Sequence, residues 1–517
     1  MTLPNLSLPG LYYDEAADAA PAMQLLLGHA VETVRGSGIS ILGRTFPVMA
    51  FDYVGPLHTY AAIPFFAMFG INPFALRLMT VAGGAATIVL TSYWAGDLAG
   101  SRSAGWMAGL LLAVHPSFVY YVRQGIHVSS LLALWMVAAL WLLLRWRRGG
   151  GTGMLVAAAF VLGVGLSTKV LFAWVIVALI AIGAARFAPA LRRRIARRAG
   201  PSRWETAAAA MTVAAFILGC APLLIYNIQT GGTLQALLRG ALVSQHGIDN
   251  TRYLENLAAR LESFRLLLDG GHFWFLGAVH GTVINPLALA AALMVLLLAA
   301  FRGGNGDRAK TAAAFLAGFM ALVLLQSPFT LSDVYPTHLF MLLPIVTAII
   351  AIAAQTLRNG RSRAAGYAVT TGVLLLALIN LGVDLQYRAS LQRSGGLAGH
   401  SDAINRLASY LDQQGIARPY AMDWGMKYNI EVLTQDQVKP VEVFGYARDP
   451  DSGFTPRLTA ALDAPGAVFL FHDAAHTVYP RFDAFSRLVQ SSGRELKQRA
   501  RFPQRDGTPL YLVYEVQ

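Results

Sequence analysis

The sequence predicts an all-α polytopic membrane domain of about ten spans, followed by a small α/β soluble domain on the external face. Three observations lead to this prediction. Of the 517 residues, 55% are hydrophobic and only 13% are charged, whereas soluble domains carry roughly 25% charged residues. The apolar residues fall into windows of about 18–22 residues, the length that a helix needs to cross a bilayer. From about residue 400 onward the composition becomes that of a soluble domain.

The apolar windows place ten membrane-spanning helices. They lie near residues 75–95, 104–121, 128–145, 153–167, 170–186, 207–226, 282–301, 311–329, 338–357 and 365–385. We therefore assign residues 1–385 to the membrane domain, with external loops at 1–74 and 227–281, and residues 386–517 to the external domain.

The basic residues set the orientation. The net charge of +13 is concentrated in short loops that alternate with connections poorer in basic residues, as the positive-inside rule expects of cytoplasmic loops. This distribution argues against a nucleic-acid surface, so no nucleic-acid partner is expected. The clustered residues are Arg145, Arg147, Arg148, Arg192, Arg193, Arg194, Arg197, Arg198, Arg302, Arg308, Lys310, Arg358, Arg361 and Arg363.

With these loops inside, the prediction is a multi-pass protein of the cytoplasmic (inner) membrane whose C-terminal domain lies outside, in the periplasm. Ten crossings also leave the N-terminus outside. Because nothing visible carries that segment across, we expect one more span upstream of Met1. The single cysteine, Cys220, lies in an apolar span and excludes an intramolecular disulfide.

Two external regions carry helical patterns. Residues 14–34 have apolar groups at helical spacing, which predicts an amphipathic helix along the membrane surface, and the loop 227–281 contains similar material. In the C-terminal domain strands alternate with helices, which is typical of an α/β layer domain. Its predicted helices are 402–414, 426–434, 456–463 and 481–491, and its predicted strands are 419–422, 438–444, 467–471, 494–502 and 509–516.

Polar groups gather at four external positions and at one short turn. Ionisable groups at the depth of a membrane are costly unless they are functional or paired, so these are the candidate site residues. The positions are Tyr13 to Glu15, Asp52 to Tyr60, Tyr120 to His127, Asp333 to His338, and the lone Lys169 between the fourth and fifth spans.

These motifs resemble a known superfamily. Asp14-Glu15 after a first external turn, a Gly-Pro-Leu-x-x-Tyr run from Gly55 to Tyr60, and an Arg-Gln-Gly stretch at Arg123 stand in the same order as in the polytopic C-type glycosyltransferases. The sequence is similar to the dolichyl-phosphate-mannose-protein mannosyltransferase and lipid A aminoarabinose transferase families over roughly residues 10–385. The resemblance implies transfer of a sugar from a polyprenyl-phosphate carrier to an acceptor.

The chemistry of such a transfer assigns expected roles. A polyprenyl phosphate is a good leaving group, so the reaction needs a base for the acceptor and cations for the departing phosphate. We expect Asp14 as general base, with Glu15 beside it. An N-cap role for Asp14 and an interface-anchor role for Arg123 stay open as alternatives. The expected phosphate-binding residues are Arg123, Lys169 and His338, and the expected substrate-binding residues are Asp52, Tyr53, His58 and Tyr335.

Three function classes follow in order of preference. The first is a membrane glycosyltransferase that uses a lipid-linked hexose or pentose and acts on a protein, lipid or glycan at the outer face. The alternative is a transporter or flippase for a lipid-linked or anionic substrate, and the third is a membrane scaffold. No metal site is predicted from ligand spacing, and a divalent cation as cofactor is left open.

Overall fold

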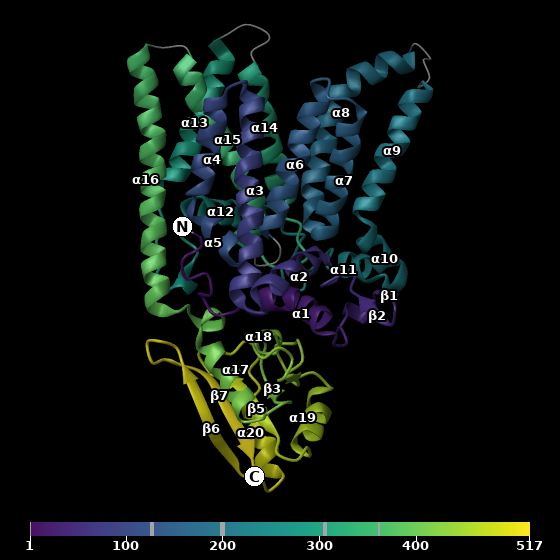
Figure 1. Cartoon of the computed structure of the whole chain (residues 1–517), viewed down its shortest axis with the longest axis vertical. Coiled ribbons are helices and arrows are strands. Elements are labelled where there is room, and N and C mark those ends of the chain that lie inside the picture. The colour runs from purple at the N-terminus through teal and green to yellow at the C-terminus, as the bar shows by residue number, and fades with distance from the viewer. Residues whose placement is uncertain (1, 125–128, 197–201, 303–307, 360–361) are drawn as a thin grey trace.

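The computed structural model describes residues 2–124, 129–196, 202–302, 308–359 and 362–517. A bundle of helices forms one part of the molecule and a small domain with a sheet forms the other (Figure 1). The predicted combination of a helical domain and a C-terminal α/β domain is therefore confirmed. Gly125 to His127 of the third polar position, and Arg197, Arg198 and Arg361 of the basic loops, lie outside the described residues.

Five helical segments are long and apolar enough to cross a membrane. They are Pro73–Ala99 (α3), Val170–Pro189, Ile284–Phe301, Pro336–Asn359 and Arg363–Ser394 (α16). The middle three belong to α8 (Ala173–Ala196), α13 (Ile284–Arg302) and α15 (Leu343–Asn359). Short 3-10 turns, Val170–Phe172 and Pro336–Leu342, precede α8 and α15.

Two further apolar helix pairs are sharply bent. The pair α4 (Arg102–Ala113) and α5 (Pro116–Gln124) meets at 61°, and the pair α9 (Arg203–Gly219) and α10 (Ala221–Thr230) meets at 64°. A proline stands in the first turn after each break, Pro116 and Pro222, where its missing N–H and its ring oppose a continuous helix. If each bent pair is one span, the described residues offer seven spans by length and composition.

The remaining bundle helices are α2 (Leu57–Phe69), α6 (Ser129–Arg147), α7 (Thr152–Thr168) and α14 (Arg308–Gln326). Each of the ten predicted spans lies on one of these helices or bent pairs, although length and composition alone support fewer than ten.

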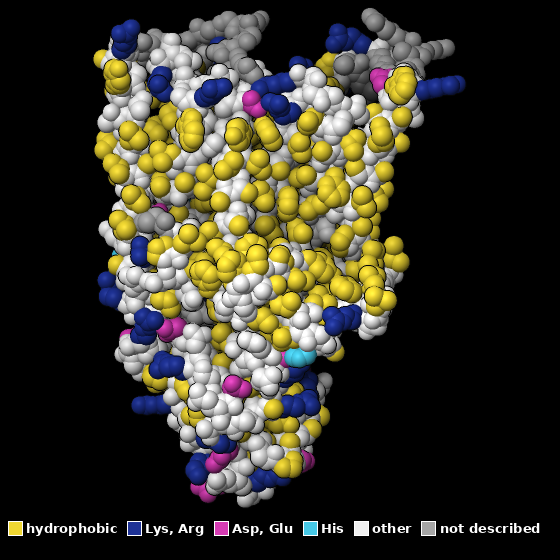
Figure 2. Space-filling view, in the orientation of Figure 1, with side chains coloured by type: hydrophobic (Ala, Val, Ile, Leu, Met, Phe, Trp, Pro, Cys, Tyr) yellow, Lys and Arg dark blue, Asp and Glu magenta, His cyan; other side chains and the backbone are white. Residues whose placement is uncertain are grey.

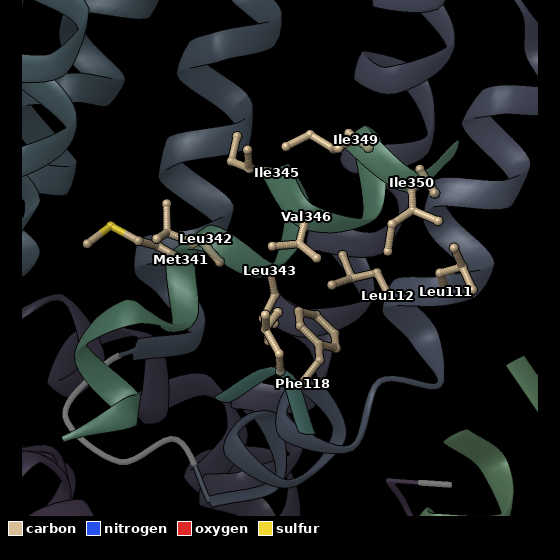
Figure 3. Packing of buried hydrophobic residues seen from close by; sticks show 14 of the residues in the cluster. Leu111, Leu112, Phe118, Met341, Leu342, Leu343, Ile345, Val346, Ile349 and Ile350 are labelled. Carbon is tan, nitrogen blue, oxygen red and sulfur yellow. The ribbon is translucent and has the colours of Figure 1, made fainter. Parts of the chain in front are cut away.

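The centre of the bundle is α15. Of the most apolar window of Pro336–Asn359, 94% is buried, against 17% for that of Val170–Pro189. Leu343, Val346 and Ile350 of α15 lie among Leu112 and Phe118 of α4 and α5 (Figure 3). Hydrophobic side chains also cover the outside of the bundle, and Lys and Arg gather at its end far from the C-terminal domain (Figure 2). This surface is typical of a membrane protein.

The N-terminal region, predicted to be external, differs in its elements from the prediction. Helix α1 (Tyr13–Leu27) stops because Gly28 adopts the left-handed conformation (φ 75°) that closes a helix, so it does not reach residue 34. A hairpin follows instead, β1 (Ile39–Ile41) and β2 (Arg44–Phe46), and then α2. Helix α1 packs between α2 and α18 (Lys427–Leu433) of the C-terminal domain and is mostly buried.

The loop 227–281 contains helices, as predicted: α11 (Gly232–Arg239), α12 (Tyr253–Asp269) and the short 3-10 turn Trp274–Leu276. The last membrane helix, α16, continues to Ser394 and thus runs past the predicted domain boundary at residue 385.

The C-terminal domain is a five-stranded mixed sheet with four helices. The strand order is β4-β3-β5-β7-β6, with β3 parallel to β4 and β5, and β7 antiparallel to β5 and β6. The predicted elements match within a few residues, except that the strand predicted at 438–444 is only two residues long. The elements are α17 (Ala403–Gln413), β3 (Tyr420–Ala421), α18, β4 (Val441–Glu442), α19 (Phe454–Leu462), β5 (Val468–His472), α20 (Phe482–Ser491), β6 (Leu496–Pro503) and β7 (Pro509–Val516).

Candidate active site

The first turn of α1 is held by a buried ion pair. Glu15 Oε1 lies 2.5 Å from Arg77 Nη2 of α3, and both side chains are fully buried. The same oxygen accepts a hydrogen bond from the backbone N–H of Tyr12, the N-cap residue, at 2.9 Å. The Arg77 guanidinium also donates to the carbonyls of Leu6, Pro9 and Gly10. The structure therefore places Glu15, a predicted catalytic residue, as an anchor of the helix start.

Asp14 stands on the same turn but in different surroundings. It is half-buried, whereas Asp18, one turn later, is fully buried. Residues four apart share one face of a helix, and both carboxylates act electrostatically on Lys169 and Tyr53. Asp18 was not among the predicted site residues, although its spacing from Asp14 could have indicated it.

A backbone contact brings Tyr53 and Lys169 together from distant parts of the chain. Val54 and Lys169 form an antiparallel bridge, and the N–H of Val170 donates to the carbonyl of Tyr53 at 3.1 Å. Next to it, the N–H of Gly55 donates to Thr168 at 3.0 Å. A Cβ at Gly55 would lie 1.9 Å from a backbone oxygen, so only glycine permits this approach.

Burial and charge shift the pKa values of these groups. Lys169 is 4% exposed, and this burial lowers its pKa to about 8 against the opposing pull of Asp18 and Asp14. Burial raises the pKa of Tyr53 to about 12, and nearby carboxylates, Asp14 first, add to the shift. Tyr335 also has a raised pKa, from burial and Asp333 and, to a lesser extent, from Asp14. We name Asp14, Asp18, Tyr53, Lys169 and Tyr335 the Asp14 cluster.

The segment that carries Tyr335 also carries His338, and it lies against a second cation. His338 is buried, with Nδ1 3.3 Å from Arg260 Nη1 of α12. Arg260 is fully buried, donates to the carbonyl of Ser327 at 2.8 Å, and sits 5.7 Å from the ring centre of Trp174. Tyr335 itself is 56% exposed. The predicted site thus gains an arginine that the sequence analysis missed.

Asp52, a predicted substrate-binding residue, lies beside the Asp14 cluster. Asp52 accepts two hydrogen bonds of 2.7 Å from Arg35 and one from the Tyr226 hydroxyl, and its pKa is lowered, with burial opposing these partners. It therefore ties the hairpin region to α10, while its charge reaches Tyr53. His58 is buried at the start of α2.

Arg123, a predicted phosphate ligand, is placed away from these groups. It is 3% exposed on α5, and its terminal nitrogens donate to four backbone carbonyls of the N-terminal segment. These belong to Thr2, Pro4, Asn5 and Leu8. Together with Arg77 it holds residues 2–10 against the bundle, so the guanidinium fork is already engaged.

The C-terminal domain covers the start of α1. The Tyr12 ring stacks on His400 with 4.0 Å between ring centres, and Trp424 lies 4.7 Å from the Tyr13 ring. The Tyr13 hydroxyl donates to Glu442 at 2.8 Å. Asp423-Trp424-Gly425, which had carried no predicted role, therefore stands directly next to the turn that carries Asp14.

The arrangement combines a half-exposed carboxylate with buried cations. A carboxylate can take a proton from a hydroxyl, and a nearby ammonium or guanidinium can stabilise a phosphate. Within the described part of the chain, no group of three or more His, Cys, Asp or Glu side chains is close enough to hold a metal ion.

Comparisons with known proteins agree with this picture. The family model described as dolichyl-phosphate-mannose-protein mannosyltransferase matches residues 53–226. The crystal structure of ArnT from Cupriavidus metallidurans in the apo state has the same fold, with a TM-score of 0.62, 12% identity, and coverage of 97% of this chain and 93% of that chain. The form bound to undecaprenyl phosphate gives a TM-score of 0.59 at 12% identity and the same coverage. None of the curated proteins matches.

Proposed function

We propose that this chain moves a sugar from a polyprenyl-phosphate carrier to an acceptor, as a C-type glycosyltransferase similar to the PMT and ArnT proteins. Its similarity to the family model over residues 53–226 and the fold that it shares with ArnT support the proposal. The reaction takes place at the outer face of the cytoplasmic membrane. The observation that carries the proposal is the Asp14 cluster, in which a half-buried carboxylate lies within electrostatic reach of a buried lysine. The ArnT structure bound to undecaprenyl phosphate supports the class of donor.

In the proposed reaction, the acceptor hydroxyl gives its proton to Asp14 as its oxygen bonds to the anomeric carbon of the sugar. The bond between that carbon and the phosphate oxygen breaks, and its electron pair leaves with the polyprenyl phosphate. Lys169 is the cation best placed to stabilise that phosphate, because its charge and that of Asp14 act on each other. Asp18, buried beside it, favours the charged form of the lysine.

The location of the charges supports transfer over transport. A transporter places ionisable groups near mid-membrane, whereas α1, which carries Asp14 and Asp18, lies where the bundle meets the C-terminal domain (Figure 1). That domain contributes Trp424 and Glu442, which contact Tyr13 in the same helix turn as Asp14.

The test is a transfer assay with purified protein in detergent. Radiolabelled polyprenyl-phosphate hexoses and pentoses are offered with protein, lipid and glycan acceptors, and the label is followed into each. We expect transfer by the wild type and by Asp412→Asn, a control in the exposed part of α17, but not by Asp14→Asn. Passage of intact carrier across proteoliposomes without any label transfer would instead support the flippase alternative.

A further inference from the structure

A cavity with apolar walls and arginines in its lining lies at the end of the bundle far from the C-terminal domain. This cavity of about 740 Å³ is bounded by α3, α6, α8 and α14, within the roughly 300–1,000 Å³ that small-molecule sites occupy. Helix α8 packs on α14, and α3 packs on both α6 and α14, so these four helices form a continuous wall. The lining is mainly Leu, Ile, Ala, Phe and Trp, as in Leu140, Ile182 and Phe315.

One end of this cavity is cationic. Arg147 and Arg148 at the end of α6 and Arg186 of α8 belong to its lining. Arg148 forms an ion pair of 3.5 Å with Asp97, which Arg145 also approaches at 3.6 Å. One carboxylate therefore faces several arginines, and the mouth of the cavity keeps a positive charge.

Two glycines leave room inside the cavity. Gly183 of α8 and Gly318 of α14 both line it, and a Cβ at either position would meet no atom within 4 Å. Neither glycine is therefore needed for close helix packing. At both positions the missing side chain leaves open space in the apolar part of the cavity.

We propose that this cavity binds an anionic diacyl phospholipid of the membrane leaflet at the arginine-rich end. The acyl chains occupy the apolar space beside Gly183 and Gly318, and the phosphate lies at Arg147 and Arg186. Basic pockets between membrane helices at such a surface select anionic headgroups, and arginine suits a phosphate because it donates two parallel hydrogen bonds. The site is remote from the Asp14 cluster and does not depend on the proposed function.

The test measures bound lipid on intact, detergent-purified protein. Dioleoylphosphatidylglycerol and dioleoylphosphatidylcholine are added in turn, and the retained lipid is counted by native mass spectrometry. We expect the wild type to retain the anionic lipid preferentially. The double variant Arg147→Gln/Arg186→Gln should retain it roughly 10–30-fold less, as loss of two cations near a membrane surface implies.

Matched controls separate the cavity from general surface charge. Arg203→Gln/Arg363→Gln removes two exposed arginines from helices that do not line the cavity and should leave retention unchanged. Gly318→Leu keeps every charge but fills the apolar space and should reduce retention, while Gly372→Leu, another position with open space around its Cβ, should not. If Gly318→Leu fails to fold, Gly183→Leu replaces it.

Three results would overturn the proposal. Equal retention of both lipids would show that the arginines do not select charge. Normal retention in Gly318→Leu, or in Gly183→Leu where it replaces it, would show that the chains do not occupy the cavity. Displacement of the lipid by millimolar inorganic phosphate would show a site for the phosphate group alone.

Discussion

Glu15 and Arg77 form an ion pair with 2.5 Å between Oε1 and Nη2, and neither side chain is exposed to solvent. Asp14, the neighbouring acid, is half-buried and belongs to a different set of contacts. Two adjacent carboxylates of one helix turn are therefore placed in different surroundings: Glu15 fixes the start of α1, and Asp14 stays the predicted general base.

Glu15→Gln should destabilise the protein strongly. The change leaves Arg77 buried without a countercharge, and breaking a buried pair in this way typically costs about 3–5 kcal/mol. Thermal unfolding in detergent measures the effect. Glu262→Gln is the matched control, because its pair with Arg265 is exposed and such pairs contribute about 0–1 kcal/mol. Equal stability of the two variants would contradict the anchoring role.

Asp14→Asn should keep the fold and lose turnover. The N-cap of α1 is Tyr12 and not Asp14, so the capping alternative does not apply and Asp14→Ala should behave in the same way. Loss of a general base typically lowers the rate roughly 10²–10⁴-fold. Turnover is measured by label transfer, and carrier binding should be unchanged. Near-normal turnover in both variants would move the base to another residue.

Lys169 should impose an alkaline limit on activity. Its pKa is about 8, so the ammonium that we propose stabilises the leaving phosphate is present below that pH and is lost above it. We expect kcat/KM, which reports the free enzyme, to fall as the pH rises past 8. Lys169→Arg should keep its charge, so the fall in kcat/KM should shift to higher pH. The exposed control Lys497→Arg should leave the pH of this fall unchanged. If kcat/KM of Lys169→Arg fell at the same pH as that of the wild type, the fall would be due to another titrating group.

Glu431 should make the protein less stable as the pH rises. Burial raises its pKa from 4.5 to about 8, against the opposing charge of Lys427. Between these values the folded state holds a proton that the unfolded state has released, so stability falls with increasing pH across this window. Glu431→Gln should remove that slope from thermal unfolding curves, and the exposed control Glu495→Gln should retain it. A slope that survives in Glu431→Gln would contradict the assignment.

Arg123→Lys should loosen the N-terminal segment. One ammonium cannot reproduce a guanidinium fork that serves four carbonyls, so residues 2–10 should exchange their amide hydrogens faster. The control is Arg102→Lys, at an exposed position of α4. The sequence had predicted a phosphate contact instead. A weaker apparent affinity for the carrier lipid with unchanged exchange would support that original role.

The sequence predicted those elements whose signal is local. Apolar windows located the bundle helices, and alternation of strands and helices located nearly every element after residue 400. The end of α1 was missed because the apolar spacing continues past Gly28, where the backbone turns into the left-handed region. The burial of α1 was missed because it depends on α18, which lies far along the chain.

For the candidate site too, residue types with a local signal were predicted, and contacts with distant parts of the chain were not. Acids, tyrosines and Lys169 were recognised by residue type and predicted side of the membrane, and the structure brings Asp14, Tyr53, Lys169 and Tyr335 together. Asp18 could have been predicted, because it lies four residues after Asp14 and thus on the same face of a helix. The engagement of Arg123 with carbonyls could not be predicted, because a backbone acceptor leaves no trace in the sequence.

The position of α1 between α2 and α18 has a consequence for biosynthesis. Asp14 is translated well before Trp424 and Glu442, which close over its helix turn. Translation must therefore pass Glu442, and the domain that carries it must fold, before that turn has its finished surroundings. A polypeptide that ends before Trp424 would contain the membrane helices yet lack this cover, so the order of translation delays assembly of the site until that domain has been made.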